Sequence, residues 1–152
     1  MLDQHVRSVY TVSAMPLTFG PRLKAFLDEP IAITVGTTRR DGSVQMNPVW
    51  YEYRDGQFWL NGGPNRDWFK HLERDPRVTL YLLDPKGPFR WAAVQGRLAD
   101  TTFEGADDHI EHLSQRYTGG PYRGPKVERM IIRIDAERVS GGENRQPWDV
   151  TA

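Results

Sequence analysis

A glycine-rich turn followed by basic residues is the stretch of this sequence best suited to binding an anion. Residues 61–70 read NGGPNRDWFK, in which Gly62 and Gly63 permit close approach of the backbone to a ligand. A helix that begins here offers unpaired N–H groups and the positive end of its dipole to a phosphate. Arg66 and Lys70 are four residues apart and therefore share one face of that helix. The residues alone leave two interpretations open, a phosphate site and a solvated cationic face.

A second candidate is the segment 45–51, which reads QMNPVWY. Pro48 lacks the N–H that a strand ladder needs, so we expect the strand to be bulged there or to lie at a sheet edge. Backbone groups left unpaired by such an edge can hydrogen-bond a flat heterocycle, and Trp50 or Tyr51 can line its face. Taken alone, the segment is better interpreted as an ordinary edge strand whose aromatic residues belong to the core.

A pair of histidines, His109 and His112, follows two aspartates and suggests a metal site, because residues three apart on a helix can bind the same metal ion. The predicted helix is charged on all sides and no third group of ligands is evident, so a solvated helix face is favoured and no metal is predicted. The sequence also lacks a Gly-x-Ser-x-Gly elbow, a His-Glu-x-x-His pair and a Gly-x-Gly-x-x-Gly fingerprint. A hydrolase is therefore not expected, and no catalytic residue is assigned.

The totals of the chain narrow its class. Its 152 residues are enough for one domain with a real core, and 20 basic residues balance 20 acidic ones. Neutrality argues against a nucleic-acid or membrane-surface binder, and the absence of cysteine excludes disulfides and thiolate zinc sites. Residues 1–16 lack the apolar core of a signal peptide, and no run is long enough to span a membrane. A cytoplasmic protein is the default expectation.

The elements that must position these residues are mostly strands. Alternating apolar residues and Asp-Gly turns predict six strands, over 31–37, 43–53, 57–61, 77–83, 89–98 and 130–134. Residues 77–83 are apolar on both faces and predict a central, fully buried strand. Helices are expected over 17–27, from an N-cap at Asn65 to 74, and from Thr101 or Thr102 to about 117. Hairpin connections favour a mainly β fold with short helices, in which the strands form an antiparallel barrel.

The order of the motifs is familiar. TTRRDGSVQMNPVWYEY is followed by FWLNGGPNRDWFKHLERDPRVTLYLLDPKGPFRWAAVQGRL, then by QRYTGGPY and MIIRIDAERV. Over roughly residues 18–140 this resembles the flavin/deazaflavin oxidoreductase branch of the pyridoxamine 5′-phosphate oxidase-like split-barrel proteins. The strongest local match is to the pattern NLRRDPRVSL…DPDNPYR…V.GR of that branch. We accordingly divide the chain into an arm (1–16), a split-barrel domain (17–140) and a tail (141–152).

The resemblance implies a homodimer of six-stranded Greek-key split barrels with two cofactor sites at the subunit interface. The cofactor in the family is the deazaflavin coenzyme F-420 or, in other branches, FMN. Its ring lies along the second strand, and its phosphate lies near the third strand and the following helix. The cofactor-binding residues implied here are Gln45, Asn47, Pro48, Val49, Trp50, Asn61, Gly62, Gly63, Asn65, Arg66, Trp68, Lys70 and Trp91.

Three of these residues have particular implied roles. Arg66 matches the phosphate-binding arginine of the family, whereas many members carry a lysine where this chain has Trp68. That departure leaves open whether Lys70 takes over, whether the tryptophan stacks on the cofactor, and whether F-420 or FMN is bound. Trp91 lies on the strand that reaches the partner's site in the family.

The expected function is hydride transfer between coenzyme F-420 and a small planar organic substrate. One alternative is an FMN-dependent oxidase of a pyridoxine-like phosphate, for which Arg123 and Lys126 are the available basic residues. Another is a non-enzymatic protein of the same fold that holds a flavin, haem or a lipid-like ligand. The expected partners are the small molecules and a second copy of the chain, with no nucleic acid and no membrane.

Overall fold

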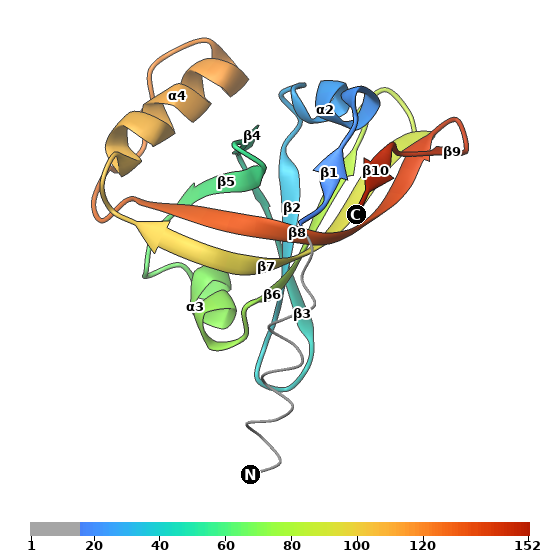
Figure 1. Cartoon of the computed structure of the whole chain (residues 1–152). Coiled ribbons are helices and arrows are strands. Elements are labelled where there is room, and N and C mark those ends of the chain that lie inside the picture. The colour runs from blue at the N-terminus through green and yellow to red at the C-terminus, as the bar shows by residue number, and fades with distance from the viewer. Residues whose placement is uncertain (1–15) are drawn as a thin grey trace.

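The computed structural model describes residues 16–152, so the expected arm lies outside the described residues except for Pro16. The fold is mainly β with three short helices, as predicted (Figure 1). The helices are α2 (Pro21–Leu27), α3 (Asp67–Arg74) and α4 (Ala106–Thr118). The strands are β1 (Thr18–Phe19), β2 (Ile33–Thr38), β3 (Val44–Val49), β4 (Tyr51–Arg54), β5 (Gln57–Gly62), β6 (Arg77–Leu83), β7 (Arg90–Thr102), β8 (Met130–Glu143), β9 (Gln146–Pro147) and β10 (Val150–Thr151).

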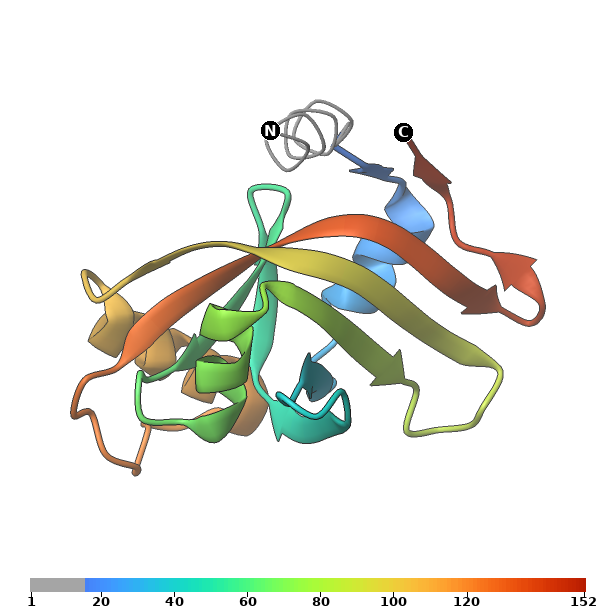
Figure 2. The same cartoon turned by 90° about the horizontal axis from the view of Figure 1, so that it is seen from below.

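The main sheet closes on itself through one bent segment of chain. Its hydrogen-bonded order is β3-β2-β6-β7-β8-β5-β4, with every pairing antiparallel. The two ends of this row, β3 and β4, are consecutive in the chain and are separated only by Trp50. They are the two halves of the single strand predicted over 43–53. The sheet therefore wraps into the predicted six-stranded barrel, whose curvature is visible in Figure 2.

The predicted turns and the proline edge are present. Gly42 has a φ of 88°, and Asp55 and Gly56 have φ values of 52° and 76°, which is the mirror-image turn that suits a tight hairpin. Pro48 pairs in register with Thr34 of β2. No other strand of residues 16–152 pairs with β3, so Pro48 lies on an edge strand, one of the two predicted arrangements.

The core is built from the inward faces of the strands and from α2 and α3. On β6, Val78, Leu80 and Leu82 point inward and are buried. The prediction that this strand is buried on both faces is wrong, because Tyr81 and Leu83 are 38% and 44% exposed. β6 is central in the row of strands, yet no other part of residues 16–152 covers its outer face. Its apolar outer residues are therefore left on the surface.

Several element ends differ from the sequence prediction. The helix expected over 17–27 begins only at Pro21, because Thr18–Phe19 instead pairs with β10 as a strand. β7 continues to Thr102, and α4 begins after Gly105, which adopts a left-handed conformation with a φ of 75°. The threonines expected to cap the third helix therefore belong to a strand.

The C-terminal segment packs on the barrel domain. β8 continues to Glu143, and β9 pairs back onto it. Trp148 stacks on Phe26 of α2 with ring centroids 5.1 Å apart. The Asp149 carboxylate accepts hydrogen bonds of 2.9 Å from the backbone N–H groups of Arg22 and Leu23, so it caps the first turn of α2. This contact orients α2 against the end of the barrel.

Candidate functional site

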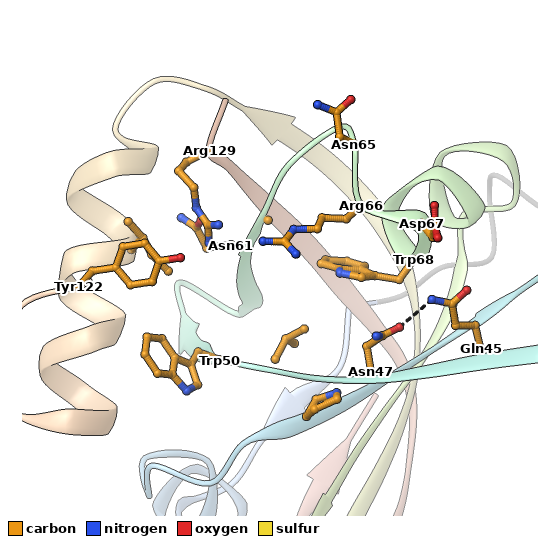
Figure 3. Close-up of a pocket in the computed structure, with 14 residues that line it drawn as sticks. Gln45, Asn47, Trp50, Asn61, Asn65, Arg66, Asp67, Trp68, Tyr122 and Arg129 are labelled. Carbon is orange, nitrogen blue, oxygen red and sulfur yellow. Dashed lines mark hydrogen bonds between the residues drawn. The ribbon is translucent and has the colours of Figure 1, made fainter. Parts of the chain in front are cut away.

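A cavity of about 570 Å³ lies between the outer edge of β3, the turn from β5 to α3, helix α4 and the segment that precedes β8 (Figure 3). Of the residues predicted to bind a cofactor, the cavity brings together Gln45, Asn47, Pro48, Val49, Trp50, Asn61, Gly62, Asn65, Arg66 and Trp68. The remaining wall is formed by residues that the sequence did not indicate, namely Asp67, Ile110, Tyr122 and Arg129.

One wall is the unpaired edge of β3. Pro48 lacks an N–H there, and β3 pairs with β2 alone among the strands of residues 16–152, so its other side is left without a strand partner. Helix α3 fixes the side chains beside this edge through Gln45, whose Oε1 lies 3.0 Å from His71 Nε2 and whose Nε2 donates to Asn47 Oδ1 at 3.0 Å. This wall presents an unpaired strand edge and an oriented amide to the cavity.

The opposite wall is aromatic. Trp50, at the bend between β3 and β4, stacks on Tyr117 with ring centroids 5.3 Å apart and planes 6° from parallel. Tyr122 meets the same indole edge-on at 6.3 Å. The Tyr117 hydroxyl donates to the carbonyl of Ile31 at 2.8 Å, and the backbone N–H of Tyr122 donates to Glu111 at 3.0 Å. Both tyrosines are therefore held in place by the barrel and α4.

The floor near α3 depends on a glycine. A Cβ on Gly62 would lie 2.9 Å from Cζ2 of Trp68 and 3.3 Å from Cδ1 of Ile132. Gly62 therefore lets the indole of Trp68 pack directly against β5, and Trp68 is 6% exposed. Trp68 is therefore both a cavity wall and a core residue.

Two arginines occupy one end of the cavity, and their side chains point toward each other (Figure 3). Arg66 is the N-cap residue of α3, and Arg129 directly precedes β8. Arg129 is 8% exposed, its Nε donates to Asn61 Oδ1 at 2.8 Å, and its guanidinium lies 5.3 Å from the Tyr122 ring centroid. Burial, and next the charge of Arg66, lower the pKa of Arg129.

These two cations have no carboxylate counter-ion, since neither forms an ion pair within residues 16–152. Like charges in a partly buried space repel each other, and an anion bound between them removes that penalty. The cavity end therefore fits a phosphate, and the open β3 edge beside an aromatic wall fits a planar ring. A volume of this size lies in the range of small-molecule sites.

Several predicted residues lie elsewhere. Gly63 and Lys70 are outside the cavity lining, and so is Trp91, whose ring faces Tyr81 on the outer side of the sheet at 6.0 Å. Asn65 is not the cap of α3, because the helix begins two residues later. Its Nδ2 instead donates to Glu128 at 3.2 Å.

Helix α4 is less solvated than its charge pattern predicted. His112 is exposed, but His109 is 5% exposed and lies against Asn61 and Glu52, so for His109 the prediction is wrong. Arg123 is exposed, and Lys126 is paired with Glu111 outside the cavity. None of the helices in the described residues is long and apolar enough to cross a membrane.

Apart from Asp67 beside Arg66, Arg129 is the charged residue of the candidate site that the sequence did not reveal. It follows a glycine- and proline-rich loop, in which a single arginine carries no periodic signal. Antiparallel pairing places Asn61 opposite Ile131 and Gly62 opposite Met130, so the residue just before β8 necessarily meets the end of β5. Arg129 could have been found only by predicting that the strands over 57–61 and 130–134 pair with each other.

Comparison with known proteins agrees with this fold. The family model described as pyridoxamine 5′-phosphate oxidase matches residues 19–141. An F-420 reductase structure is similar, with a TM-score of 0.70 and 24% identity over 77% of this chain and 94% of that one. A conserved hypothetical protein of Mycobacterium tuberculosis has a TM-score of 0.68 and 24% identity over 85% and 88%. A FAD-binding protein of Mesorhizobium loti has a TM-score of 0.55 and 18% identity over 82% and 96%. No curated protein sequence matches the chain.

Proposed function

The chain belongs to the pyridoxamine 5′-phosphate oxidase family, and on this premise we propose that it is an oxidoreductase whose cavity holds the deazaflavin coenzyme F-420. The observation that carries the proposal is the pair Arg66 and Arg129 at one end of a cavity whose side wall is the open edge of β3. Two of the similar structures are, by name, an F-420 reductase and a FAD-binding protein, which supports a cofactor of flavin type.

At the basic end, Arg66 and Arg129 would bind the phosphate of the cofactor. A guanidinium presents several donors in a fixed plane and remains charged, so two of them form a strong clamp on a phosphate. This arrangement supports one answer to the question raised by Trp68. The second cation at this end is Arg129, which directly precedes the strand beside β5 and does not belong to α3, whereas Lys70 does not line the cavity.

Along the side wall, the backbone of residues 47–49 would hydrogen-bond the polar edge of the ring. The Gln45 bridge from His71 keeps the Asn47 amide oriented toward that position. Trp50 would bound the end of the ring, because it is already stacked on Tyr117 and cannot rotate freely. Trp68 would close the opposite side.

The reduced cofactor supplies a hydride from its ring carbon, and the protein supplies binding, orientation and exclusion of water. The aromatic wall formed by Trp50 and Tyr122 favours a small planar organic substrate, because flat rings stack on such side chains. No side chain in the cavity is assigned as the proton donor. The chain's own contribution to the reaction is therefore positional and electrostatic.

We further propose that the active form is a homodimer. The outer face of β3 and β6, with the loop that precedes β7, exposes a group of large apolar residues: Val44, Met46, Tyr81, Leu83 and Phe89. Burying such a face against a second copy removes it from water. Pro48 lies on the same edge and also lines the cavity, so a partner on this face would approach the cofactor site. Trp91 contacts Tyr81 on this face, which supports its proposed role in the partner's site.

Two other functions are alternatives to F-420-dependent hydride transfer. The same clamp and edge suit FMN, which also combines a planar ring with a phosphate, so an FMN-dependent oxidase is the second candidate. A carrier of a flavin or haem without turnover is the third. It is favoured by one observation, that no acid–base pair lines the cavity within the described residues.

The test is a titration of the purified full-length chain with coenzyme F-420 and with FMN, followed by quenching of tryptophan fluorescence. Trp50 and Trp68 line the cavity and report binding there. The variants are Arg66→Ala and Arg129→Met, and the matched control is Arg40→Ala, which removes an exposed arginine outside the cavity. We expect tight binding of F-420, weakened about tenfold or more by each cavity variant and unchanged in the control.

Preferential binding of FMN would move the oxidase candidate to first place. A Soret band in the visible spectrum of the purified protein would indicate haem. Dissociation constants above about 100 μM for both cofactors, which correspond to roughly −5.5 kcal/mol, would overturn the proposal. Turnover with enone and quinone acceptors then separates an enzyme from a carrier.

A further inference from the structure

A chain of buried polar side chains leads from the cavity to the far side of α4. It begins at Arg129, whose Nε donates to Asn61 Oδ1 at 2.8 Å. Asn61 Nδ2 lies 3.1 Å from Nδ1 of His109, and His109 Nε2 lies 3.4 Å from Oε1 of Glu52. Glu52 Oε2 then lies 2.6 Å from Nε2 of His112 at the surface. The three side chains between the ends are nearly buried, with exposed fractions of 7% for Asn61, 5% for His109 and 9% for Glu52.

The chemistry of the partners fixes the orientation of Asn61. A guanidinium can only donate, so the atom that faces Arg129 must be the amide oxygen. The amide nitrogen has two hydrogens, and the carbonyl of Ala106, 3.0 Å away, takes one of them because a carbonyl can only accept. The second hydrogen points to His109 Nδ1, which must therefore be the unprotonated ring nitrogen.

The tautomer of His109 follows from this orientation. A neutral imidazole with a bare Nδ1 carries its proton on Nε2, which faces Oε1 of Glu52. Burial alone would raise the pKa of Glu52, but the neighbouring His109 and His112 outweigh it and lower the pKa. His109 Nε2 and Glu52 Oε1 have no other hydrogen-bond partner within the described residues, so the ionised carboxylate 3.4 Å away favours the proton on this outer nitrogen of His109.

We propose that Asn61, His109 and Glu52 are positioning residues that hold the guanidinium of Arg129 in the cavity. Within residues 16–152 the hydrogen bond to Asn61 is the only one made by the Arg129 side chain, and the guanidinium also lies over the face of Tyr122. The remaining guanidinium donors are thereby left for an anionic group of the ligand. This inference rests on the proposed function, in which that group is the cofactor phosphate.

Each link can fail separately, which makes the chain testable. Replacing Asn61 by Leu removes the acceptor of Arg129, whereas Asp keeps an oxygen at that place. Replacing His109 by Phe removes the acceptor of the second amide hydrogen, so the amide nitrogen is held by the carbonyl of Ala106 alone and its oxygen is less firmly placed against Arg129. The matched control is Ser114→Ala on the same helix, which removes a buried hydrogen bond of 2.8 Å to Gly120 outside the polar chain.

The first measurement needs no ligand. Nitrogen-15 NMR of the full-length protein at neutral pH is expected to show His109 with an unprotonated Nδ1 and a protonated Nε2, assigned by its loss in His109→Phe. The Arg129 Nε–H is expected to be protected from solvent exchange in the wild type and in Asn61→Asp and Ser114→Ala. The protection is expected to be lost in Asn61→Leu and His109→Phe. The opposite tautomer, or unchanged protection in those two variants, would overturn the positioning role.

The second measurement isolates the phosphate. The affinity of coenzyme F-420 is compared with that of the same deazaflavin without its phosphate side chain. We expect the ratio to fall about tenfold or more in Arg129→Met, Asn61→Leu and His109→Phe, and to survive in Ser114→Ala. An unchanged ratio in folded His109→Phe and Asn61→Leu contradicts the inference. A wild type that does not distinguish the two compounds contradicts the proposed function instead, while the NMR result still decides the positioning role.

Discussion

Two arginines near the ends of one connection, Arg116 on α4 and Arg129 before β8, have the same side chain and opposite surroundings. Arg116 donates to four backbone carbonyls, those of Leu27, Asp28, Glu29 and Tyr51, at 2.8–3.1 Å. Arg129 has one side-chain hydrogen bond within the described residues, to Asn61. A guanidinium carries five N–H donors. Those of Arg116 are used by the main chain, whereas most of those of Arg129 have no acceptor within the described residues.

The charges around the two arginines also differ. Three of the carbonyls that Arg116 contacts lie at and just beyond the end of α2, where the negative end of the helix dipole favours a cation. Arg129 instead has a second cation, Arg66, as its neighbour. Hydrogen-bond saturation and the sign of the neighbouring charge together distinguish Arg116, which holds main-chain carbonyls, from Arg129, the arginine proposed to bind a ligand.

The largest expected effect is the loss of Arg116. Arg116→Met would remove the donor shared by four carbonyls, of which that of Leu27 keeps a second donor in the Tyr51 hydroxyl, and is expected to lower the free energy of unfolding by about 3 kcal/mol, as measured by urea denaturation. Cofactor affinity of the folded protein is expected to stay unchanged. A loss below about 1 kcal/mol would break the comparison, because Arg116 would then not hold α2 to the barrel.

Arg129→Met is expected to do the reverse. The dissociation constant for the cofactor should rise about 10- to 100-fold, since a charge-assisted hydrogen bond contributes about 1.5–3 kcal/mol. The free energy of unfolding should change by no more than about 1 kcal/mol, because an uncompensated buried cation is removed together with its single bond. Calorimetry and urea denaturation measure both. A large loss of stability with unchanged affinity would place Arg129 in the structural class.

Gly62→Ala tests Trp68, which is both a wall of the cavity and a residue of the core. The added Cβ would lie 2.9 Å from the Trp68 ring, so the indole must shift, at a cost of about 1–2 kcal/mol in the free energy of unfolding. The tryptophan emission spectrum and the cofactor affinity should change together. Gly87→Ala is the control, because nothing lies within 4 Å of its new Cβ, and it should alter neither.

The smallest expected effect is that of a surface ion pair. The hydrogen bond from Arg77 lowers the pKa of Asp75 from 3.8 to about 2. The contribution of this pair is therefore fully present above pH 3.8 and is lost as the pH falls through about 2. Asp75→Asn should cost about 1 kcal/mol or less at neutral pH, since Arg77 is largely exposed and solvent screens the pair. The unfolding curves of variant and wild type should converge near pH 2.

The sequence predicted the parts of the fold that depend on local patterns. The six strands, both Asp-Gly turns and the proline edge follow from alternation and turn chemistry between near neighbours in the chain. The cavity wall formed by residues 45–50 and 61–68 could likewise be predicted, because those residues are contiguous. The exposed outer face of β6 could not, since alternation does not say whether anything covers a face.

The parts that escaped prediction depend on distant partners. Arg129 enters the cavity through the register of β8 on β5, which no neighbouring residue encodes. The charge pattern of its helix predicts that His109 is solvated. Its burial is explained by contacts with Asn61 of β5 and Glu52 of β4, which are distant in the sequence. Lys70 has the correct spacing from Arg66, but the helix begins at Asp67, so Arg66 caps the helix and the two residues have different surroundings.

The edge of β3 has a consequence for the fate of the protein in concentrated solution. An unpaired strand edge is a template on which another chain can add a strand, and such additions lead to aggregates. Pro48 removes one donor from the middle of this edge, and the bend at Trp50 ends it immediately afterwards. The proline therefore denies a foreign strand a continuous ladder, so the open edge of β3 can persist without nucleating fibres.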